Sequence, residues 1–150
     1  MRSGSIDLRR DPPSVLLVDD VEANLIALEA VLSDLPCTLV RARGGNDALK
    51  LLLKRRYAVM LLDVQMPDID GWEVLASIRA DRSLDPIPVV MCTVRAGAAD
   101  RARGYGHGAD AYEAKPFDLD QLLGTVRRLA HMDVEHLLER RAALWTEAQA

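Results

Sequence analysis

The sequence predicts an α/β fold: a doubly wound, five-stranded parallel sheet with helices on both faces and an extra C-terminal helix. Two observations predict it. Five short apolar runs alternate with segments of helical periodicity, and each run is nearly continuous in apolar character. Such strands are typical of a sheet covered on both faces, and repeated βα units give parallel strands with right-handed crossovers. The expected strands are residues 14–18, 38–42, 58–62, 87–92 and 110–114.

The segments between and after these strands carry apolar residues at the spacing of an amphipathic helix. In the first segment Leu25, Leu28 and Leu32 fall on one helical face. Asp70 stands directly before Gly71, where its carboxylate can cap the start of the third helix. The expected helices are residues 22–33, 45–56, 71–80, 96–105 and 118–130.

Length and composition are those of an ordinary globular chain. The 150 residues, of which 49% are hydrophobic and 28% charged, suffice for one substantial core. The net charge of −4 argues against a nucleic-acid surface. No apolar run reaches the ~18 residues of a membrane span, and the N-terminus carries no secretory signal. We therefore expect a cytoplasmic protein with reduced cysteines and without nucleic-acid or membrane partners.

The chain divides into three parts. Residues 1–13, MRSGSIDLRRDPP, are polar, charged and closed by two prolines, so we expect a flexible N-terminal arm. Residues 14–130 hold the βα units, and residues 131–150 form a C-terminal helical extension or linker. Two geometries are open for this extension. It folds back as a sixth helix, or it continues the preceding helix outward to a total length of about 45 Å.

The C-terminal extension contains no proline or glycine. Its apolar residues lie near one helical stripe, which Arg141 interrupts. The stripe is too short to define a coiled coil. The residues of this stripe are Val134, Leu137, Leu138, Leu144 and Trp145.

Polar side chains follow several strands at the point where each strand ends. Asp19 and Asp20 follow the first strand in SVLLVDD, and Asp63 follows the third in LLDVQMPDIDG. Thr93 follows the fourth strand, and Lys115 follows the fifth. In doubly wound sheets, ligands bind beyond the carboxyl ends of the strands where the strand order reverses. If the order is 2-1-3-4-5, all five side chains meet at one edge of the sheet.

This set of side chains indicates phosphoryl chemistry. Three ionised carboxylates about 5 Å apart repel by roughly 3 kcal/mol per pair at an effective dielectric constant near 20. A site that keeps them must bind a cation or hold protons. Oxygen ligands at an open rim suit Mg²⁺ better than zinc, which prefers nitrogen and sulfur. With a lysine and a hydroxyl nearby, one acid can attack phosphorus while the cations neutralise the phosphoryl oxygens.

Four stretches of the sequence resemble those of one family. VLLVDD, LLDVQMPDIDG, VVMCTV and KPF occur in the order found in the receiver domains of bacterial two-component response regulators. The resemblance covers about residues 14–130 and implies the flavodoxin-like strand order 2-1-3-4-5. VEANLIALEAVLSDL and LLLKRRYAVMLLDVQMPDIDGWEVL also resemble receivers linked to hybrid histidine kinases or cyclases.

The resemblance implies a role for each acid of the expected site. Asp63 resembles the phosphoacceptor, which takes a phosphoryl group from the phosphohistidine of a histidine kinase. Asp19 and Asp20 match the acid pair that binds Mg²⁺, and Asp63 and the backbone carbonyl of Gln65 are the further ligands. Mg²⁺ is accordingly the expected cofactor.

The resemblance also implies a switch. Thr93 and Lys115 match the hydroxyl and the ammonium that contact the new phosphoryl group, and a cis peptide is expected between Lys115 and Pro116. Tyr112 matches an aromatic residue that turns inward when Thr93 is drawn to the phosphate. By analogy, a face built from residues 96–130 then changes its interactions with other proteins.

The partners implied are a sensor histidine kinase or phosphotransfer protein and an output domain absent from this chain. A homodimer through the 96–130 face or the C-terminal helix is a further expectation. One departure from the family is Val94, which stands where a small residue usually follows the threonine. We hypothesise that its side chain narrows access to Asp63.

Three other functions compete with this interpretation. A phosphatase with an aspartate nucleophile would need a second acid two residues later, where this chain has Gln65. A nucleotide or flavin binder would need a glycine-rich or hydroxyl-rich loop after the first strand, whereas GYGHGA at residues 104–109 follows a helix. A degenerate receiver would act as a phosphate-independent interaction or dimerisation module, although every expected acid is present.

Overall fold

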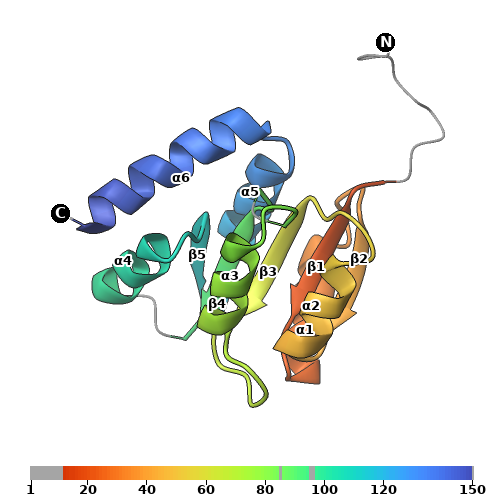
Figure 1. Cartoon of the computed structure of the whole chain (residues 1–150). Coiled ribbons are helices and arrows are strands. Elements are labelled where there is room, and N and C mark those ends of the chain that lie inside the picture. Colours follow the sequence, from red (N-terminus) through yellow and green to blue (C-terminus); the bar gives the residue numbers. More distant parts are fainter. Residues whose placement is uncertain (1–11, 85, 95–96, 150) are drawn as a thin grey trace, which may run out of the picture.

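A computed structural model describes residues 12–84, 86–94 and 97–149. Five strands form one parallel sheet with helices on both faces, as the sequence predicts (Figure 1). The strands are β1 (Ser14–Val18), β2 (Thr38–Ala42), β3 (Val59–Asp63), β4 (Val89–Thr93) and β5 (Ala111–Ala114). The helices are α1 (Glu22–Leu32), α2 (Gly45–Leu52), α3 (Gly71–Ala80), α4 (Ala98–Gly106), α5 (Leu119–Ala130) and α6 (Val134–Gln149).

The strand order is β2-β1-β3-β4-β5, which confirms the predicted flavodoxin-like topology. β1 and β3 are neighbours, and Val18 lies opposite Leu62. Asp63 lies opposite Cys92 in β4. Because the strands are parallel and in this register, the residues that follow β1, β3 and β4 emerge at the same edge of the sheet.

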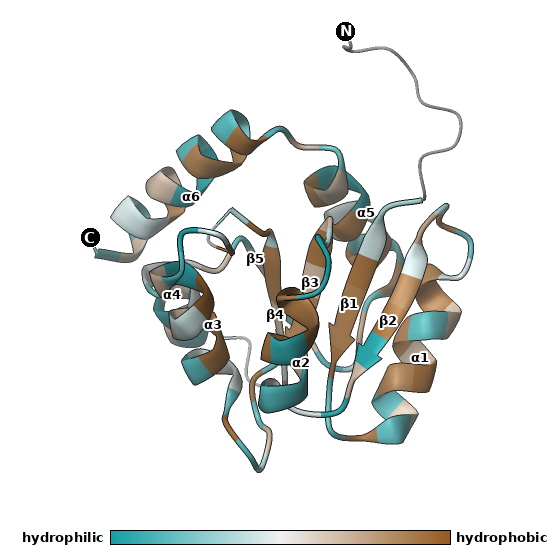
Figure 2. Ribbon diagram, turned by 45° about the vertical axis from the view of Figure 1, so that its right-hand side comes forward, coloured by the Kyte–Doolittle hydropathy of each residue, from teal (hydrophilic) through white to brown (hydrophobic). Residues whose placement is uncertain are grey.

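The sheet separates two apolar layers. Leu16 and Met60 face the layer formed with α2 and α3, whereas Leu17 and Leu61 face the layer formed with α1 and α5. All four side chains are fully buried, and each contributes roughly 1.5–3 kcal/mol through its burial. Figure 2 shows the resulting pattern, with hydrophobic strands inside and hydrophilic residues on the outer faces of the helices. Burial on both faces explains why the strands are nearly continuous in apolar character.

Several element boundaries differ from the predicted ones, and two of these differences have a clear physical cause. α2 ends at Leu52 instead of residue 56, because the chain must turn to bring the buried Tyr57 into the core before β3. β4 begins at Val89 instead of residue 87. Pro88 has no N–H to donate to a ladder, and the N–H of Val89 is bonded to a carboxylate oxygen of Asp110 at 2.8 Å.

Some expectations lie outside the described residues. These are residues 1–11 of the expected arm and residue 96, the expected start of the fourth helix. Both cysteines are free thiols, with Cys92 buried and Cys37 half-buried. Within the described ranges, no helix combines the length and apolar character that crossing a bilayer requires.

The C-terminal segment folds back instead of projecting outward. The helix α5 ends at Ala130, and a new helix, α6, begins at Val134. Asp133 caps the start of α6 by accepting a hydrogen bond from the N–H of His136 at 2.8 Å. α6 then lies along α4 (Figure 1). The expected apolar stripe lies on a helix, but only part of it is covered: Leu137 is fully buried and Leu144 is half-buried. The exposed members are Val134, Leu138 and Trp145.

Two neighbouring residues fix the start of α3 against the end of β3. The carboxylate of Asp70 accepts a hydrogen bond from the N–H of Glu73 at 3.0 Å, which confirms the predicted cap. The N–H of Gly71 donates to the carbonyl of Val64 at 2.8 Å. A Cβ atom at Gly71 would lie 2.4 Å from the carbonyl oxygen of Asp63. Only glycine allows this close approach, so Gly71 helps to position the backbone of Asp63.

We predict that Gly71→Ala lowers the free energy of unfolding by roughly 1–3 kcal/mol, because α3 must move away from the backbone of Asp63. Urea denaturation of the purified variant measures this change. Gly124→Ala in α5 is the matched control, since nothing lies within 4 Å of the position its Cβ would take. That control should raise the free energy of unfolding by roughly 0.5–1 kcal/mol. Equal effects of the two substitutions would contradict the packing argument.

Candidate functional site

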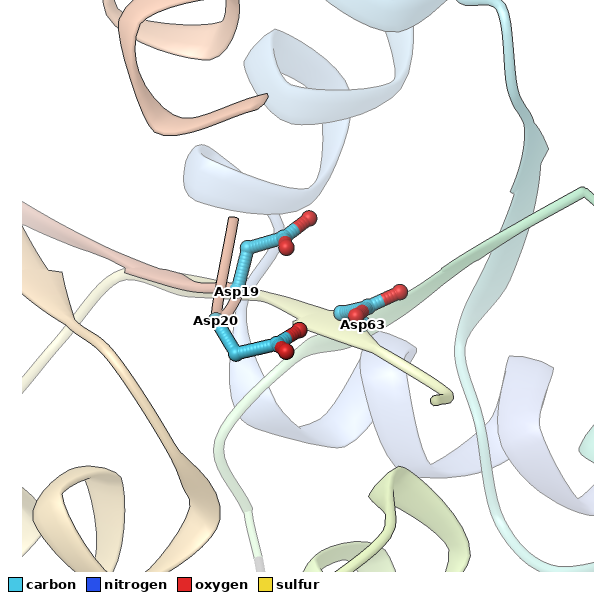
Figure 3. Close-up of side chains that lie close together, drawn as sticks. All are labelled: Asp19, Asp20 and Asp63. Carbon is cyan, nitrogen blue, oxygen red and sulfur yellow. The ribbon is translucent and has the colours of Figure 1, made fainter. Parts of the chain in front are cut away.

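Three carboxylates meet at the edge of the sheet where the strands end (Figure 3). Asp19 and Asp20 directly follow β1, and Asp63 is the last residue of β3. Each residue offers a carboxylate oxygen, and these oxygens lie within 4.8 Å of one another. Asp19 and Asp63 are 1% and 5% exposed, whereas Asp20 faces solvent. The structure thus brings the three acids of the expected site together.

Lys115 inserts its ammonium between two of these acids. Its Nζ lies 2.9 Å from Oδ2 of Asp19 and 2.9 Å from Oδ1 of Asp63. Its backbone N–H donates to the carbonyl of Thr93 at 2.8 Å, so β5 holds the lysine beside the end of β4. The predicted cis peptide between Lys115 and Pro116 is present. The lysine offsets the repulsion that Asp19 and Asp63 would otherwise exert on each other.

The shifted pKa values reflect this arrangement. Burial raises the pKa of the Asp63 carboxyl, the hydrogen bond and charge of Lys115 offset part of that rise, and the charges of Asp19 and Asp20 add to it. Burial alone would lower the pKa of Lys115, but its hydrogen bonds to Asp19 and Asp63 outweigh burial and raise it. The lysine therefore carries a fixed positive charge at neutral pH.

The residues present fit a divalent cation. Every donor atom in the acid cluster is a carboxylate oxygen, which is the ligand type that Mg²⁺ prefers. Three carboxylates and one ammonium carry a formal charge of −2, which one divalent ion would neutralise. Asp20, the exposed member, lies on the solvent side from which an ion would enter.

A cavity of about 620 Å³ opens beside the acid cluster. Asp20, Gln65, Thr93 and Tyr112 all contribute to its walls, so the remaining residues of the expected site border the same space. Thr93 is buried at the end of β4, whereas Gln65 is exposed in the loop after β3. Val94, directly after Thr93, is 66% exposed. A group that enters this cavity can reach both a carboxylate and a hydroxyl.

Tyr112 occupies an inward position. Its side chain is 2% exposed, and its ring packs against α4 at Gly104, where a Cβ atom would lie 2.7 Å from a ring carbon. The guanidinium of Arg101 lies 5.7 Å from the ring centroid and donates to the carbonyl of Tyr112 at 3.3 Å. Burial raises the pKa of the Tyr112 hydroxyl. The aromatic ring is therefore held under α4 and beside the cavity.

The sequence did not reveal three residues of the cavity wall, namely Trp72, Asp100 and Arg103. The guanidinium of Arg103 lies 4.5 Å from the ring centroid of Trp72, which joins α3 to α4 across the cavity mouth. These residues lie on helices, so the rule that places ligands at strand ends could not find them. The sequence signal that was available is a tryptophan directly after Gly71 at the start of a helix.

Several known proteins similar to this chain are response regulators. The family model described as the response regulator receiver domain matches residues 15–127. Response regulator Rre1 of Synechocystis sp. is 37% identical over 120 residues, which are 79% of this chain and 52% of that protein. Response regulator PleD of Caulobacter vibrioides is 35% identical over 131 residues, which are 86% of this chain and 29% of that protein. This chain thus spans about half of the first relative and less of the second.

A solved structure supports the same comparison. The signal receiver domain of an HD domain-containing protein from Pseudomonas fluorescens has a TM-score of 0.74 to this chain. It is 29% identical in sequence, and the alignment covers 91% of this chain and 97% of that one. The fold, with its strand order and helices, is therefore shared with a receiver domain of known structure.

We predict that Asp63→Asn raises the free energy of unfolding near neutral pH in metal-free buffer. Burial holds the pKa of Asp63 above its ordinary value of 3.8 in the folded protein. The wild type therefore loses stability as the pH rises from that value through the raised pKa, and asparagine does not. The stability difference between variant and wild type in urea unfolding should shrink as the pH falls below 3.8.

Asp34→Asn, at an exposed position, is the control for a lost negative charge and should show no such pH-dependent gain. An Asp63→Asn protein that is less stable than the wild type near neutral pH would contradict the argument from burial.

Proposed function

This chain belongs to the response regulator receiver domain family, and from that membership we propose that Asp63 accepts a phosphoryl group from the phosphohistidine of a histidine kinase. The chain is a signalling domain of two-component systems and not a conventional enzyme. Its chemistry would be confined to its own phosphotransfer and the later hydrolysis of the aspartyl phosphate. The single observation that carries the proposal is the contact of Lys115 with both Asp19 and Asp63 beside an open cavity.

The transfer step uses Asp63 as the nucleophile. A carboxylate oxygen of Asp63 attacks phosphorus while the bond between phosphorus and the imidazole nitrogen breaks, and the electron pair of that bond leaves with the imidazole. Lys115, already 2.9 Å from Oδ1 of Asp63, offsets the negative charge that arrives. Thr93 lines the same cavity and would donate its hydroxyl to a phosphoryl oxygen. These groups are in place before the phosphoryl group arrives, which favours electrostatic stabilisation of the transition state.

Asp19, Asp20 and Asp63, with the backbone carbonyl of Gln65, would hold the Mg²⁺ ion. When bound, Mg²⁺ neutralises the charge of the phosphoryl oxygens. Asp19 is suited to its role because its Oδ1 accepts a hydrogen bond from the N–H of Val21 at 2.9 Å, which fixes the orientation of the carboxylate. The formal charge of −2 without the ion supports the assignment of a divalent cation.

Phosphorylation would act through Thr93 and Tyr112. A phosphoryl group brings roughly −1.5 to −2 charges next to Lys115 and draws the Thr93 hydroxyl towards it. The inward ring of Tyr112 borders the cavity and packs against α4 at Gly104. We therefore assign the interaction face to α4, β5 and α5, whose surface changes when the population shifts between the two states.

The domain limits and partners follow from the same proposal. The proposed limits are residues 14–130 for the receiver domain and 131–150 for the C-terminal extension, whereas most of the expected arm, residues 1–13, lies outside the described residues. The partners would be a sensor histidine kinase or phosphotransfer protein in the cytoplasm and an output domain outside this chain. A homodimer would form through the 96–130 face or through the C-terminal helix.

We predict that acetyl phosphate and Mg²⁺ add one phosphoryl group to the wild-type chain and none to Asp63→Asn. Intact-protein mass spectrometry measures the modification directly.

Asp20→Asn should weaken the apparent affinity for Mg²⁺ by at least about tenfold, because one of three carboxylates is lost. Asp34→Asn removes an acid far from the site in sequence and should behave like the wild type. A wild-type chain that takes up no phosphoryl group and binds no beryllofluoride would favour the phosphate-independent interaction module instead.

The exposed side chain of Val94 generates a separate prediction. We expect Val94→Ala to shorten the lifetime of the aspartyl phosphate about threefold to tenfold, because a smaller side chain at the rim admits the attacking water more readily. The decay of the phosphorylated species, followed by mass spectrometry after the donor is removed, gives this lifetime. Equal lifetimes for the variant and the wild type would refute the role of Val94.

A further inference from the structure

A buried carboxylate at the opposite edge of the sheet anchors the C-terminal helix. Asp110 lies directly before β5 and is fully buried. Arg79 of α3 donates from Nη2 to its Oδ2 at 2.9 Å. Arg141 of α6 donates from Nε to Oδ1 at 2.9 Å and from Nη2 to Oδ2 at 3.1 Å. Two guanidinium groups from different helices therefore share one carboxylate.

The two arginines hold different parts of the molecule. Arg79 also donates to the carbonyls of Gly108 and Ile87, both at 2.9 Å, so it ties together loops that belong to the sheet. Arg141 ties α6 to the same carboxylate, and the neighbouring Arg140 donates to the carbonyl of Asp110. Because Asp110 keeps Arg79 as a cationic partner when Arg141 is removed, the sheet does not need the pair with Arg141 to balance this charge.

α4 lies between the docked helix and the inward tyrosine. On one side of α4, Gly104 leaves room for the ring of Tyr112. On the other side, Gly106 faces α6, and a Cβ atom there would lie 3.4 Å from Nε2 of Gln149 and 3.9 Å from Cβ of Ala148. A displacement of α4 therefore changes its contact with the switch residue and its contact with α6 together.

We propose that α6 is an internal ligand of α4 and β5, locked by Arg141 on Asp110, and that its docking favours the inward position of Tyr112. The second half of this statement rests on the proposed function, in which the position of Tyr112 reports phosphorylation of Asp63. The first half rests on the described contacts alone.

The structure indicates the direction of the coupling between α6 and the acid site. In one conformation α6 is docked, α4 contacts both α6 and Tyr112, and Tyr112 is buried. A ligand that binds one state better than another shifts the population towards it, and the effect is reciprocal. Docked α6 should therefore raise the affinity of the acid site for a phosphoryl group, and phosphorylation should tighten the docking of α6.

The test replaces Arg141 by methionine in the full chain. Hydrogen exchange of the α6 backbone amides, read by mass spectrometry, reports docking without any phosphoryl ligand. Titration with beryllofluoride in the presence of Mg²⁺, followed by calorimetry, reports the acid site, with beryllofluoride standing in for the phosphoryl group. We expect exchange in α6 to accelerate and the affinity for beryllofluoride to fall at least about fivefold. Unchanged exchange overturns the lock, and faster exchange with unchanged or higher affinity overturns the coupling.

Two further variants sharpen the test. Arg128→Met makes the same chemical change at an exposed position of α5 and should alter neither measurement. Gly106→Leu obstructs the end of α6 without touching Asp110, so it should reproduce both effects of Arg141→Met. If the wild-type chain binds no beryllofluoride, the proposed function and the coupling are both overturned. The hydrogen-exchange measurement then still tests whether the contact of Arg141 with Asp110 holds α6 in place.

Discussion

The ion pairs of Lys115 with Asp19 and Asp63 are the interaction on which the rest of the site depends. Two buried carboxylates this close would repel strongly in a poorly hydrated environment, and one of them would have to take up a proton. The ammonium between them offsets this repulsion, although burial still raises the pKa of Asp63. The three carboxylates and this ammonium together still carry a net negative charge, which a divalent ion would neutralise. Nucleophile, cation and metal ligands are therefore parts of one electrostatic arrangement.

This arrangement depends on topology more than on local structure. Asp19 and Lys115 are 96 residues apart in sequence, and the parallel sheet with the order β2-β1-β3-β4-β5 brings the ends of their strands to one edge. The close approach of Gly71 to the backbone of Asp63 then fixes α3 over the site. Because the strands are buried on both faces, polar side chains gather at the strand ends, and this is where the acid cluster lies.

The sequence predicted the sheet from its βα periodicity, and it predicted the meeting of the acids at one edge from the strand order that the family resemblance implies. Other contacts could not be predicted, since they join distant segments through side chains with no local pattern. Asp68, in the loop between β3 and α3, accepts hydrogen bonds from the N–H groups of Gly45 and Asn46 at 3.2 and 3.0 Å and so caps α2 from another loop. Those bonds lower the pKa of Asp68. The sequence around Gly45 shows only that α2 lacks a capping side chain of its own.

Arg141 shows the same limit in a stronger form. A charged residue within the apolar stripe of a helix usually indicates a solvated face. Arg141 is an exception, because it is buried against the carboxylate of Asp110. Burying a guanidinium requires that its lost hydration be replaced by hydrogen bonds of good geometry, which a carboxylate supplies to Nε and Nη2 together. Leu137 adds a buried apolar contact, but the remaining large apolar residues of α6 are exposed or only half-buried. The helix is therefore held by an ion pair and by its packing along α4, and free-energy differences of a few kcal/mol in the position of α4 suffice to change its docking.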